Sequence, residues 1–323
     1  MLKVAIISSW HVHAGGYAEE FKARPDVQVT AVWDEEAKKG QDFANWQKLP
    51  FEPDLDKLLA TDIDAVCINA PTNIHPEVII KCAKAGKHIF TEKVLALTNK
   101  EAQEIAAAVK AAGVKFCISF PHRTFPSNLF AKKVVEEKLL GDITYMRMRN
   151  AHNGASAGWL PPHFYSKEQC GGGAMIDLGA HPMYLIPWLM GKPAEVSSVF
   201  TSVTGREVED NAVTVMKYAN GAVAVSETGF VSSHSPSMLE LYGTAGSLMI
   251  IGGEVRFVSE KSTGGKWQTV TDLPEGLPSP IAQFVDGVLY GKEIVFGMDD
   301  AIVLTEMMDA AYRAHGSGGF AKI

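Results

Sequence analysis

Three residues combine a side chain suited to proton transfer with a position where it can act. Lys93 follows a short apolar run, His88–Phe90, and stands directly after Glu92. A lysine at the carboxyl end of a parallel strand points into a crevice, where partial desolvation lowers its pKa toward a catalytic range. Asp177 and His181 are four residues apart after three consecutive glycines, so on one helix they share a face. We predict Lys93, Asp177 and His181 as catalytic residues; the alternative for Lys93 is a solvated surface position.

A histidine beside a carboxylate is suited to general acid or base catalysis, because it titrates near neutral pH. His181 could equally be half of a metal site built on two histidines. No H-E-x-x-H or comparable spacing accompanies it. The sequence therefore predicts no metal.

The loop after the first apolar run departs from the usual signature of a dinucleotide site. That signature is G-x-G-x-x-G, whose glycines permit a tight turn and let backbone N–H groups approach a pyrophosphate. Here the three glycine places hold Ser8, Trp10 and His13. His11 and His13 either donate to a phosphate or belong to a substrate pocket; the alternative is a loop that packs Trp10 into the core. The predicted cofactor site includes the whole loop: Ser8, Trp10, His11, Val12 and His13.

Asp34 ends the second apolar run and is the predicted partner of the cofactor ribose. A carboxylate there accepts hydrogen bonds from the ribose hydroxyls of NAD and repels the 2′-phosphate of NADP. Two glutamates and no arginine follow it, so NAD is favoured over NADP; the alternative is a helix N-cap. The loops after the next strands complete the predicted cofactor site with Ala70, Pro71, Asn73, His75, Glu92 and Lys93.

These residues follow short apolar runs that alternate with helix-period segments over the first 120 residues. The runs are nearly continuous and β-branched, which is typical of parallel strands buried on both faces. They are Val4–Ile7, Val29–Trp33, Ala65–Ile68, His88–Phe90 and Val114–Ser119. The predicted helices between them are Ala14–Ala23, Glu35–Trp46, Leu55–Ala60, Ile74–Ala85 and Thr98–Ala112, the last with a capping box, Thr98 and Glu101. We predict a doubly wound parallel sheet with ligands bound outside the carboxyl ends of its strands.

The pattern changes after residue 121. A helix, Ser127–Glu137, and a strand, Ile143–Arg149, precede a Gly/Pro-rich loop and a second helix, Ala174–Leu189. Six strand-like runs follow, and Asn220-Gly221 between two of them is a two-residue hairpin signal. Two helices close the chain. The fold class is therefore α/β: a Rossmann domain over residues 1–121, then an α+β domain over residues 122–323 with an open, mainly antiparallel sheet.

Composition and net charge limit the classes of partner that the protein can bind. The chain has 323 residues and a net charge of −7, with its basic residues scattered. This disfavours nucleic acid and anionic membranes as partners. No apolar run is long enough for a spanning helix or a signal-peptide core. The four cysteines show no C-x-x-C pairing, so we expect free, buried thiols in a cytoplasmic protein.

Three segments together resemble the glucose-fructose oxidoreductase / inositol dehydrogenase / MocA (Gfo/Idh/MocA) family. They are Asp64-Ala-Val-Cys-Ile-Asn-Ala-Pro71-x-x-x-His75, Ala85-Gly-Lys-His-Ile-Phe-x-Glu92-Lys93, and Gly171-Gly-Gly-x-x-x-Asp177-x-Gly-x-His181. The resemblance implies NAD(P)-dependent oxidation or reduction of sugars, cyclitols or related polyols. It places Lys93, Asp177 and His181 near the nicotinamide. It also implies a homo-dimer or homo-tetramer formed through the C-terminal sheet.

The sequence departs from that family in the missing glycines and in Glu92-Lys93-Val94, where the family has Glu-Lys-Pro. A cis bond before a residue other than proline costs about 3–4 kcal/mol. We therefore expect the Lys93–Val94 bond to be trans.

The function predicted from these features is hydride transfer between NAD and a sugar or polyol, with His181 or Lys93 removing the hydroxyl proton. Aromatic faces and forked donors suit a sugar ring and its hydroxyls. On that ground the predicted substrate-binding residues are His122, Arg123, Trp159, His163 and Tyr165. Two alternatives remain: a non-catalytic sensor with the same fold, motivated by Trp10, and a lyase or glycosidase that uses NAD transiently.

Overall fold

The computed structural model describes all 323 residues and divides into two compact units. The parallel-sheet unit contains Met1–Ser119 and Pro278–Thr305, and the mixed-sheet unit contains Phe120–Leu277 and Glu306–Ile323. The segment 278–305, which we expected in the second domain, thus belongs to the first unit. The reason is an apolar helix, α9 (Pro280–Tyr290), whose buried Phe284 packs edge-to-face on Phe21 with ring centroids 6.4 Å apart.

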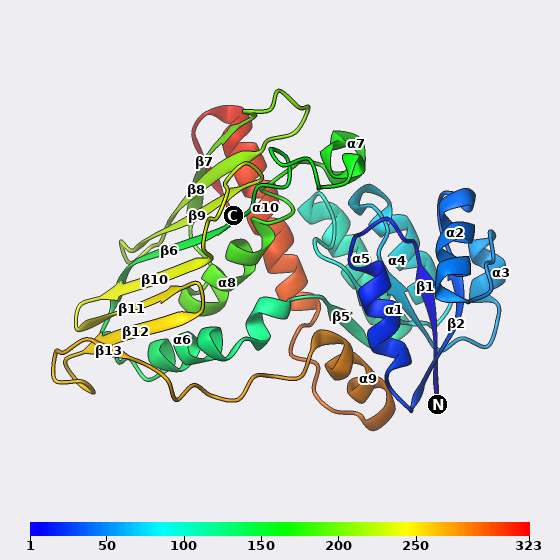
Figure 1. Ribbon diagram of the computed structural model, residues 1–323, viewed down its shortest axis with the longest axis horizontal. Coiled ribbons are helices and arrows are strands. Elements are labelled where there is room, and N and C mark those ends of the chain that lie inside the picture. The colour runs from blue at the N-terminus through cyan, green and yellow to red at the C-terminus, as the bar shows by residue number, and fades with distance from the viewer. The chain divides into compact units, whose positions relative to one another are not determined.

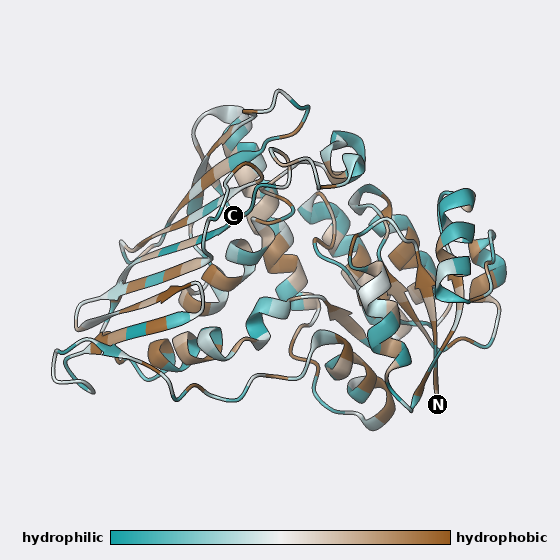
Figure 2. Ribbon diagram, viewed as in Figure 1, coloured by the Kyte–Doolittle hydropathy of each residue, from teal (hydrophilic) through white to brown (hydrophobic).

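The parallel-sheet unit is a five-stranded sheet of order β2-β1-β3-β4-β5, with all strands parallel. Its strands are β1 (Leu2–Ile7), β2 (Val27–Trp33), β3 (Ala65–Ile68), β4 (His88–Thr91) and β5 (Phe116–Ile118). Hydrophobic residues concentrate on these strands (Figure 2), and every residue of β3 is buried. The strand order reverses between β1 and β3, where a doubly wound sheet opens a crevice for its ligand.

Helices flank this sheet as the periodicity predicted (Figure 1). They are α1 (Ala14–Lys22), α2 (Ala37–Gln47), α3 (Leu55–Leu59), α4 (His75–Lys84) and α5 (Asn99–Ala112). The capping box of α5 is confirmed: Thr98 Oγ1 accepts from the Glu101 N–H, and the Glu101 carboxylate accepts from the Thr98 N–H. Gly113 ends the helix in the left-handed conformation, with φ 66°.

The mixed-sheet unit is built on a nine-stranded sheet of order β13-β12-β11-β10-β6-β9-β8-β7-β14. Its strands are β6 (Ile143–Ala151), β7 (Glu195–Thr201), β8 (Asn211–Lys217), β9 (Val223–Gly229), β10 (Met238–Gly243), β11 (Gly246–Ile251), β12 (Glu254–Ser259), β13 (Gln268–Thr269) and β14 (Phe320–Lys322). All neighbours are antiparallel except β6 and β9, which pair in parallel. The predicted hairpin at Asn220-Gly221 is confirmed, since Gly221 has φ 87° and its N–H donates to Tyr218 O.

Helices α6 (Pro126–Glu136) and α8 (Ala180–Met190) lie on one face of this sheet (Figure 1). Between them the chain forms a short helix, α7 (Lys167–Cys170), and the last helix, α10 (Met298–Ser317), is shared between the two units. All four cysteines are free and buried. None of the helices has the length and apolar character required to cross a bilayer.

The predicted helix Ala174–Leu189 begins six residues later than expected, at Ala180, so Asp177 lies in a turn and not on the helix. The sharing of one helical face by Asp177 and His181 is therefore a wrong prediction. The cause is the tight turn before the helix: the Gly179 N–H donates to Ala174 O at 2.9 Å. A Cβ on Gly179 would lie 2.3 Å from Met175 O, so only glycine fits.

Candidate active site

The loop after β1 keeps the backbone turn of a dinucleotide site although its glycines are missing. Ser8 stands where the first glycine is expected and has φ 70°, in the left-handed region. Its side chain compensates locally, because Ser8 Oγ accepts from the Trp10 N–H at 3.1 Å. The His11 N–H donates to Asn69 O at 3.0 Å, which ties the loop to the end of β3. Trp10, at the second glycine place, is buried with 6% of its surface exposed.

Asp34, at the end of β2, is buried and oriented by the same loop. Its Oδ2 accepts from the backbone N–H and the hydroxyl of Ser9, at 2.9 and 2.6 Å, and its Oδ1 accepts from the Glu36 N–H at 2.8 Å. Burial, together with the charge of Asp34, raises the pKa of the neighbouring Glu35 to about 6. The end of β2 therefore carries a fixed carboxylate, which suits ribose hydroxyls and opposes a 2′-phosphate.

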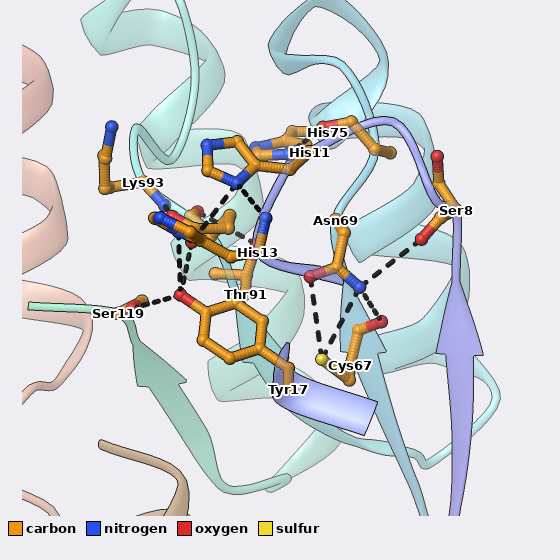
Figure 3. Close-up of polar contacts among 12 residues, drawn as sticks. Ser8, His11, His13, Tyr17, Cys67, Asn69, His75, Thr91, Lys93 and Ser119 are labelled. Carbon is orange, nitrogen blue, oxygen red and sulfur yellow. Dashed lines mark hydrogen bonds and ion pairs between the residues drawn. The ribbon is translucent and has the colours of Figure 1, made fainter. Parts of the chain in front are cut away.

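His13, Tyr17, Lys93 and Ser119 form a polar cluster at the carboxyl edge of the parallel sheet (Figure 3), and their contacts centre on Glu92. Glu92 Oε1 lies 2.6 Å from His13 Nδ1 and accepts a hydrogen bond from the Tyr17 hydroxyl. Its Oε2 accepts from the Lys93 N–H at 2.8 Å. The Tyr17 hydroxyl also lies 2.7 Å from Ser119 Oγ, so the cluster joins the ends of β4 and β5 to the start of α1.

Glu92 is a buried anion. Burial by itself raises its pKa, but the charges of His11, His13 and Lys93 and the hydrogen bond from His13 outweigh burial and hold the pKa well below its usual range. Burial and the Glu92 charge raise the pKa of Tyr17 well above its usual range, so its hydroxyl remains a donor. The cluster therefore carries one stable negative charge, surrounded by donors.

Lys93 is buried, and Figure 3 shows its side chain directed away from Tyr17. The Lys93–Val94 peptide bond is cis, so our expectation of a trans bond is wrong. The segment after it is held by His75, which is fully buried: its Nδ1 lies 3.0 Å from Val94 O, and its Nε2 lies 2.9 Å from Ala70 O. Both ring nitrogens of His75 thus face backbone carbonyls of the loops after β3 and β4.

The other predicted cofactor residues lie along the same edge. Val12 is half-exposed, while Ala70 and Pro71 are buried after β3. Asn73 follows them, and its Oδ1 is a buried oxygen without a hydrogen-bond partner. A buried acceptor after β3, a fixed carboxylate at the end of β2 and a retained turn after β1 fit a dinucleotide that supplies hydroxyl and amide donors.

The mixed-sheet unit brings His181 together with His122. Their rings stack with centroids 3.9 Å apart and an interplanar angle of 13°. His181 Nδ1 lies 2.9 Å from the Tyr184 hydroxyl, which accepts from the His122 N–H at 3.1 Å. The Tyr184 ring in turn stacks on Phe120, with centroids 4.2 Å apart. The His181 ring is therefore fixed in orientation, as a general acid or base requires.

Glu209 anchors the glycine-rich loop that leads to Asp177. Its Oε1 accepts from the N–H groups of Gly173 and Met175, at 2.8 and 2.9 Å, and from the Tyr312 hydroxyl at 2.7 Å. The glycines are required for this approach: a Cβ on Gly173 would lie 2.1 Å from the Glu209 carbonyl oxygen.

His122 and His181 both line a cavity of about 300 Å³ in the mixed-sheet unit. The sequence analysis missed the other polar residues around it, because none of them belongs to a motif. They are Ser127 and Asn128 on α6, Arg149 and Asn150 on β6, and Ser237 directly before β10. Their only sequence signal is position, since Arg149 ends a predicted strand and Asn150 follows it.

The other predicted substrate residues do not line this cavity. The buried Arg123 guanidinium lies over the Trp188 ring, 5.1 Å from its centroid. Trp159 is exposed and donates to Asn153 Oδ1 at 3.2 Å. The remaining two follow in the same loop region. His163 O accepts from Cys170 Sγ at 3.3 Å, and the Arg206 guanidinium lies over the Tyr165 ring, 4.0 Å from its centroid.

Comparison with known proteins identifies relatives of both units. Residues 3–120 match the model of an oxidoreductase family with an NAD-binding Rossmann fold, and residues 129–249 match the GFO/IDH/MocA C-terminal domain. The chain is 27% identical over 300 residues to levoglucosan dehydrogenase of Pseudarthrobacter phenanthrenivorans, covering 80% of this chain and 73% of that protein. It is 28% identical over 318 residues to scyllo-inositol 2-dehydrogenase (NAD(+)) of Bacillus subtilis, covering 91% and 88%.

Solved structures share the architecture. GenD2 from gentamicin A biosynthesis, solved in complex with NAD, is 26% identical with a TM-score of 0.84, covering 100% of this chain and 96% of that one. Levoglucosan dehydrogenase, solved with NADH and L-sorbose, has a TM-score of 0.87 at 21% identity, covering 100% and 99%.

Proposed function

The chain belongs to the Gfo/Idh/MocA oxidoreductase family, and on that premise we propose that it transfers hydride between NAD and a ring hydroxyl of a sugar or cyclitol. The observation that carries this proposal is the edge formed by Ser8, Asp34 and Asn73. There a turn with positive φ, a buried carboxylate and an open buried acceptor follow three adjacent strands of a doubly wound sheet, where dinucleotides bind.

Names of relatives support the substrate class. They include dehydrogenases of levoglucosan and of scyllo-inositol, and a D-glucoside 3-dehydrogenase of Escherichia coli that is 27% identical over 249 residues. The cavity beside His122 and His181 adds hydroxyl, amide and guanidinium groups, which suit a polyhydroxylated ring. We assign substrate binding to this cavity in the mixed-sheet unit.

We assign each residue a role from the groups that surround it. When bound, the nicotinamide supplies the hydride chemistry. His181 exchanges the hydroxyl proton at Nε2, while the Tyr184 hydroxyl fixes the ring through Nδ1. We assign stabilisation of negative charge on the substrate oxygen to the Lys93 ammonium. Asp177 stays a predicted catalytic residue, in the turn before α8. His75 serves as a positioning residue that joins the backbone after Lys93 to the loop after β3.

NADH binding and its dependence on Asp34 test the cofactor assignment. We expect saturable NADH fluorescence with the wild-type protein and markedly weaker binding of NADPH. Asp34→Ala removes the carboxylate that accepts from the ribose and leaves the Ser9 N–H, the Ser9 hydroxyl and the Glu36 N–H without their acceptor. NADH should therefore bind at least about 10-fold more weakly, and the preference for NADH over NADPH should decrease. Asp42→Ala is the control, an exposed acidic residue on α2. Equal NADH affinity in the wild type and the Asp34 variant would refute the assignment.

We also place the enzyme in a reducing compartment such as the cytoplasm, supported by its four free and buried thiols. A homo-dimer or homo-tetramer is proposed through the uncovered face of the nine-stranded sheet. On that face Val199 and Val213 are direct cross-strand neighbours and are 67% and 41% exposed. Adjacent exposed valines on a regular sheet favour association with a second apolar surface.

A further inference from the structure

The cluster around Glu92 brings together three side chains of types that bind metal ions. His11 and His13 come from the loop after β1, and Glu92 follows β4. One nitrogen of each ring and one carboxylate oxygen lie within 4.8 Å of one another. The ligand atoms around a zinc ion at bond lengths of about 2.0–2.2 Å are separated by about 3.3 Å, so these three atoms need only small side-chain rotations to share one ion.

Ring nitrogens of two histidines converge on one carboxylate oxygen. His11 Nδ1 lies 3.5 Å and His13 Nδ1 lies 2.6 Å from Glu92 Oε1. Metal binding by histidine releases the imidazole proton. A divalent cation at this point would therefore replace the imidazole protons as the positive charge beside Glu92.

We propose that His11, His13 and Glu92 bind a divalent transition metal of the zinc type. Two imidazole nitrogens and one carboxylate oxygen are ligands that Zn²⁺ and Co²⁺ accept, whereas Mg²⁺ and Ca²⁺ prefer oxygen alone. Three protein ligands leave one position open for water or another oxygen donor. The His13 side chain is 49% exposed, so the ion has a route to solvent.

Neighbouring residues hold the Glu92 carboxylate in place by hydrogen bonds. The Tyr17 hydroxyl contacts the ligating oxygen of Glu92, and Ser119 Oγ orients that hydroxyl at 2.7 Å. The Lys93 N–H holds the second carboxylate oxygen at 2.8 Å. Hydrogen bonds of this kind fix the direction of a ligating carboxylate and strengthen metal binding.

The test is Co²⁺ titration of the chelator-treated, full-length protein, followed by the visible absorption of Co²⁺. One equivalent should give a saturable band, and Zn²⁺ should displace it and remain after dialysis, as measured by elemental analysis. Zn²⁺ should also raise the melting temperature, because it binds only the folded chain. In His13→Ala, Co²⁺ affinity should fall at least about 100-fold, since even outer-shell changes cost 10–100-fold.

His234→Asn is the matched control: His234 is exposed, lies outside the cluster and has φ 56°, which asparagine tolerates. It should bind Co²⁺ like the wild type. Absence of the Co²⁺ band in the wild type, or equal affinity in His13→Ala, would overturn the proposal. His11→Gln serves as a second ligand variant, with folding checked by circular dichroism. NADH binding by the metal-free protein is measured in parallel and tests the proposed function separately.

Discussion

Single residues in the parallel-sheet unit show how a lost motif is replaced by other side chains. Ser8 adopts the φ of a glycine and uses its hydroxyl to receive the Trp10 N–H. Ser9 then places two donors on Asp34. The loop thus keeps its path by hydrogen bonds, where the usual sequence keeps it by glycines.

Lys93→Met tests the role of the ammonium. Methionine preserves length and bulk but removes the charge that stabilises the substrate oxygen, so turnover should fall by about 10²–10⁴-fold. The NADH dissociation constant should change little. Lys84→Met, an exposed lysine in the last turn of α4, is the control. Steady-state kinetics and NADH titration check both, and a variant with wild-type turnover would remove Lys93 from the mechanism.

Glu35 predicts a dependence of stability on pH. Burial and the charge of Asp34 disfavour the charged form of Glu35 and raise its pKa to about 6 from the usual 4.5. The folded state then binds a proton more tightly than the unfolded state, so this contribution is present below pH 4.5 and is lost as the pH rises through 6. The pKa difference sets an upper bound of about 2 kcal/mol, and partial exposure reduces it.

We therefore expect Glu35→Gln to be more stable than the wild type at pH 8 by up to about 1 kcal/mol, and equal to it near pH 4. Urea unfolding at both pH values measures the difference. A stability gain that is the same at both pH values would show that the effect is not the ionisation of Glu35.

The sequence predicted the position of those residues whose side chains directly follow a recognisable strand. Asp34 and Lys93 were located in this way, because strand ends in a parallel sheet meet at one edge. The association of His13 with Glu92 could not be predicted, since 79 residues separate them. The same holds for His122 stacked on His181, which depends on how α8 packs. The cis bond after Lys93 has no signal in a Lys-Val sequence.

At the scale of elements, the glycine-rich loop before α8 controls where His181 stands. The periodicity predicted one helix from Ala174, but the loop N–H groups bind Glu209 and α8 starts at Ala180. A tertiary hydrogen bond thus outweighed local propensity. Strands and most helices were predictable from the sequence, because their burial patterns repeat along the chain itself.

Gly173→Ala tests this arrangement. Its Cβ would lie 2.1 Å from a backbone oxygen, so the loop must move away from Glu209. We expect a loss of stability of about 1–3 kcal/mol and a fall in turnover larger than the fall in NADH affinity. Gly316→Ala, a helical position with no neighbour within 4 Å, should be neutral or stabilising. Thermal unfolding and steady-state kinetics measure both variants. A Gly173→Ala variant with wild-type stability and turnover would contradict the role assigned to Glu209.

At the scale of the whole molecule, the boundary between the two units could be predicted only in part from the sequence. The change of period after residue 121 marks where one sheet ends and the next begins. The local sequence does not indicate that residues 278–305 belong to the first unit, because their place depends on the packing of Phe284 against Phe21 and Phe90. Long-range apolar contacts of this kind leave no spacing in the sequence.

Val199→Glu tests association at the same scale. The wild type should show a mass that is a multiple of 35.0 kDa in light scattering coupled to size exclusion. A glutamate on the uncovered sheet face buries a charge in the proposed interface and should shift the protein toward the monomer. Val203→Glu, 70% exposed and outside the strands, is the control. A monomeric wild type would exclude the proposed interface.

The central claim is hydride transfer between NAD and a sugar or cyclitol. Its most direct test is the absorbance of reduced nicotinamide when the protein meets NAD and a panel of pyranoses, anhydrosugars and cyclitols. We predict a rise with at least one member of the panel, dependent on Lys93 and His181. Conversion of a glycoside or anhydrosugar without net formation of NADH, or no NADH binding at all, would contradict the claim.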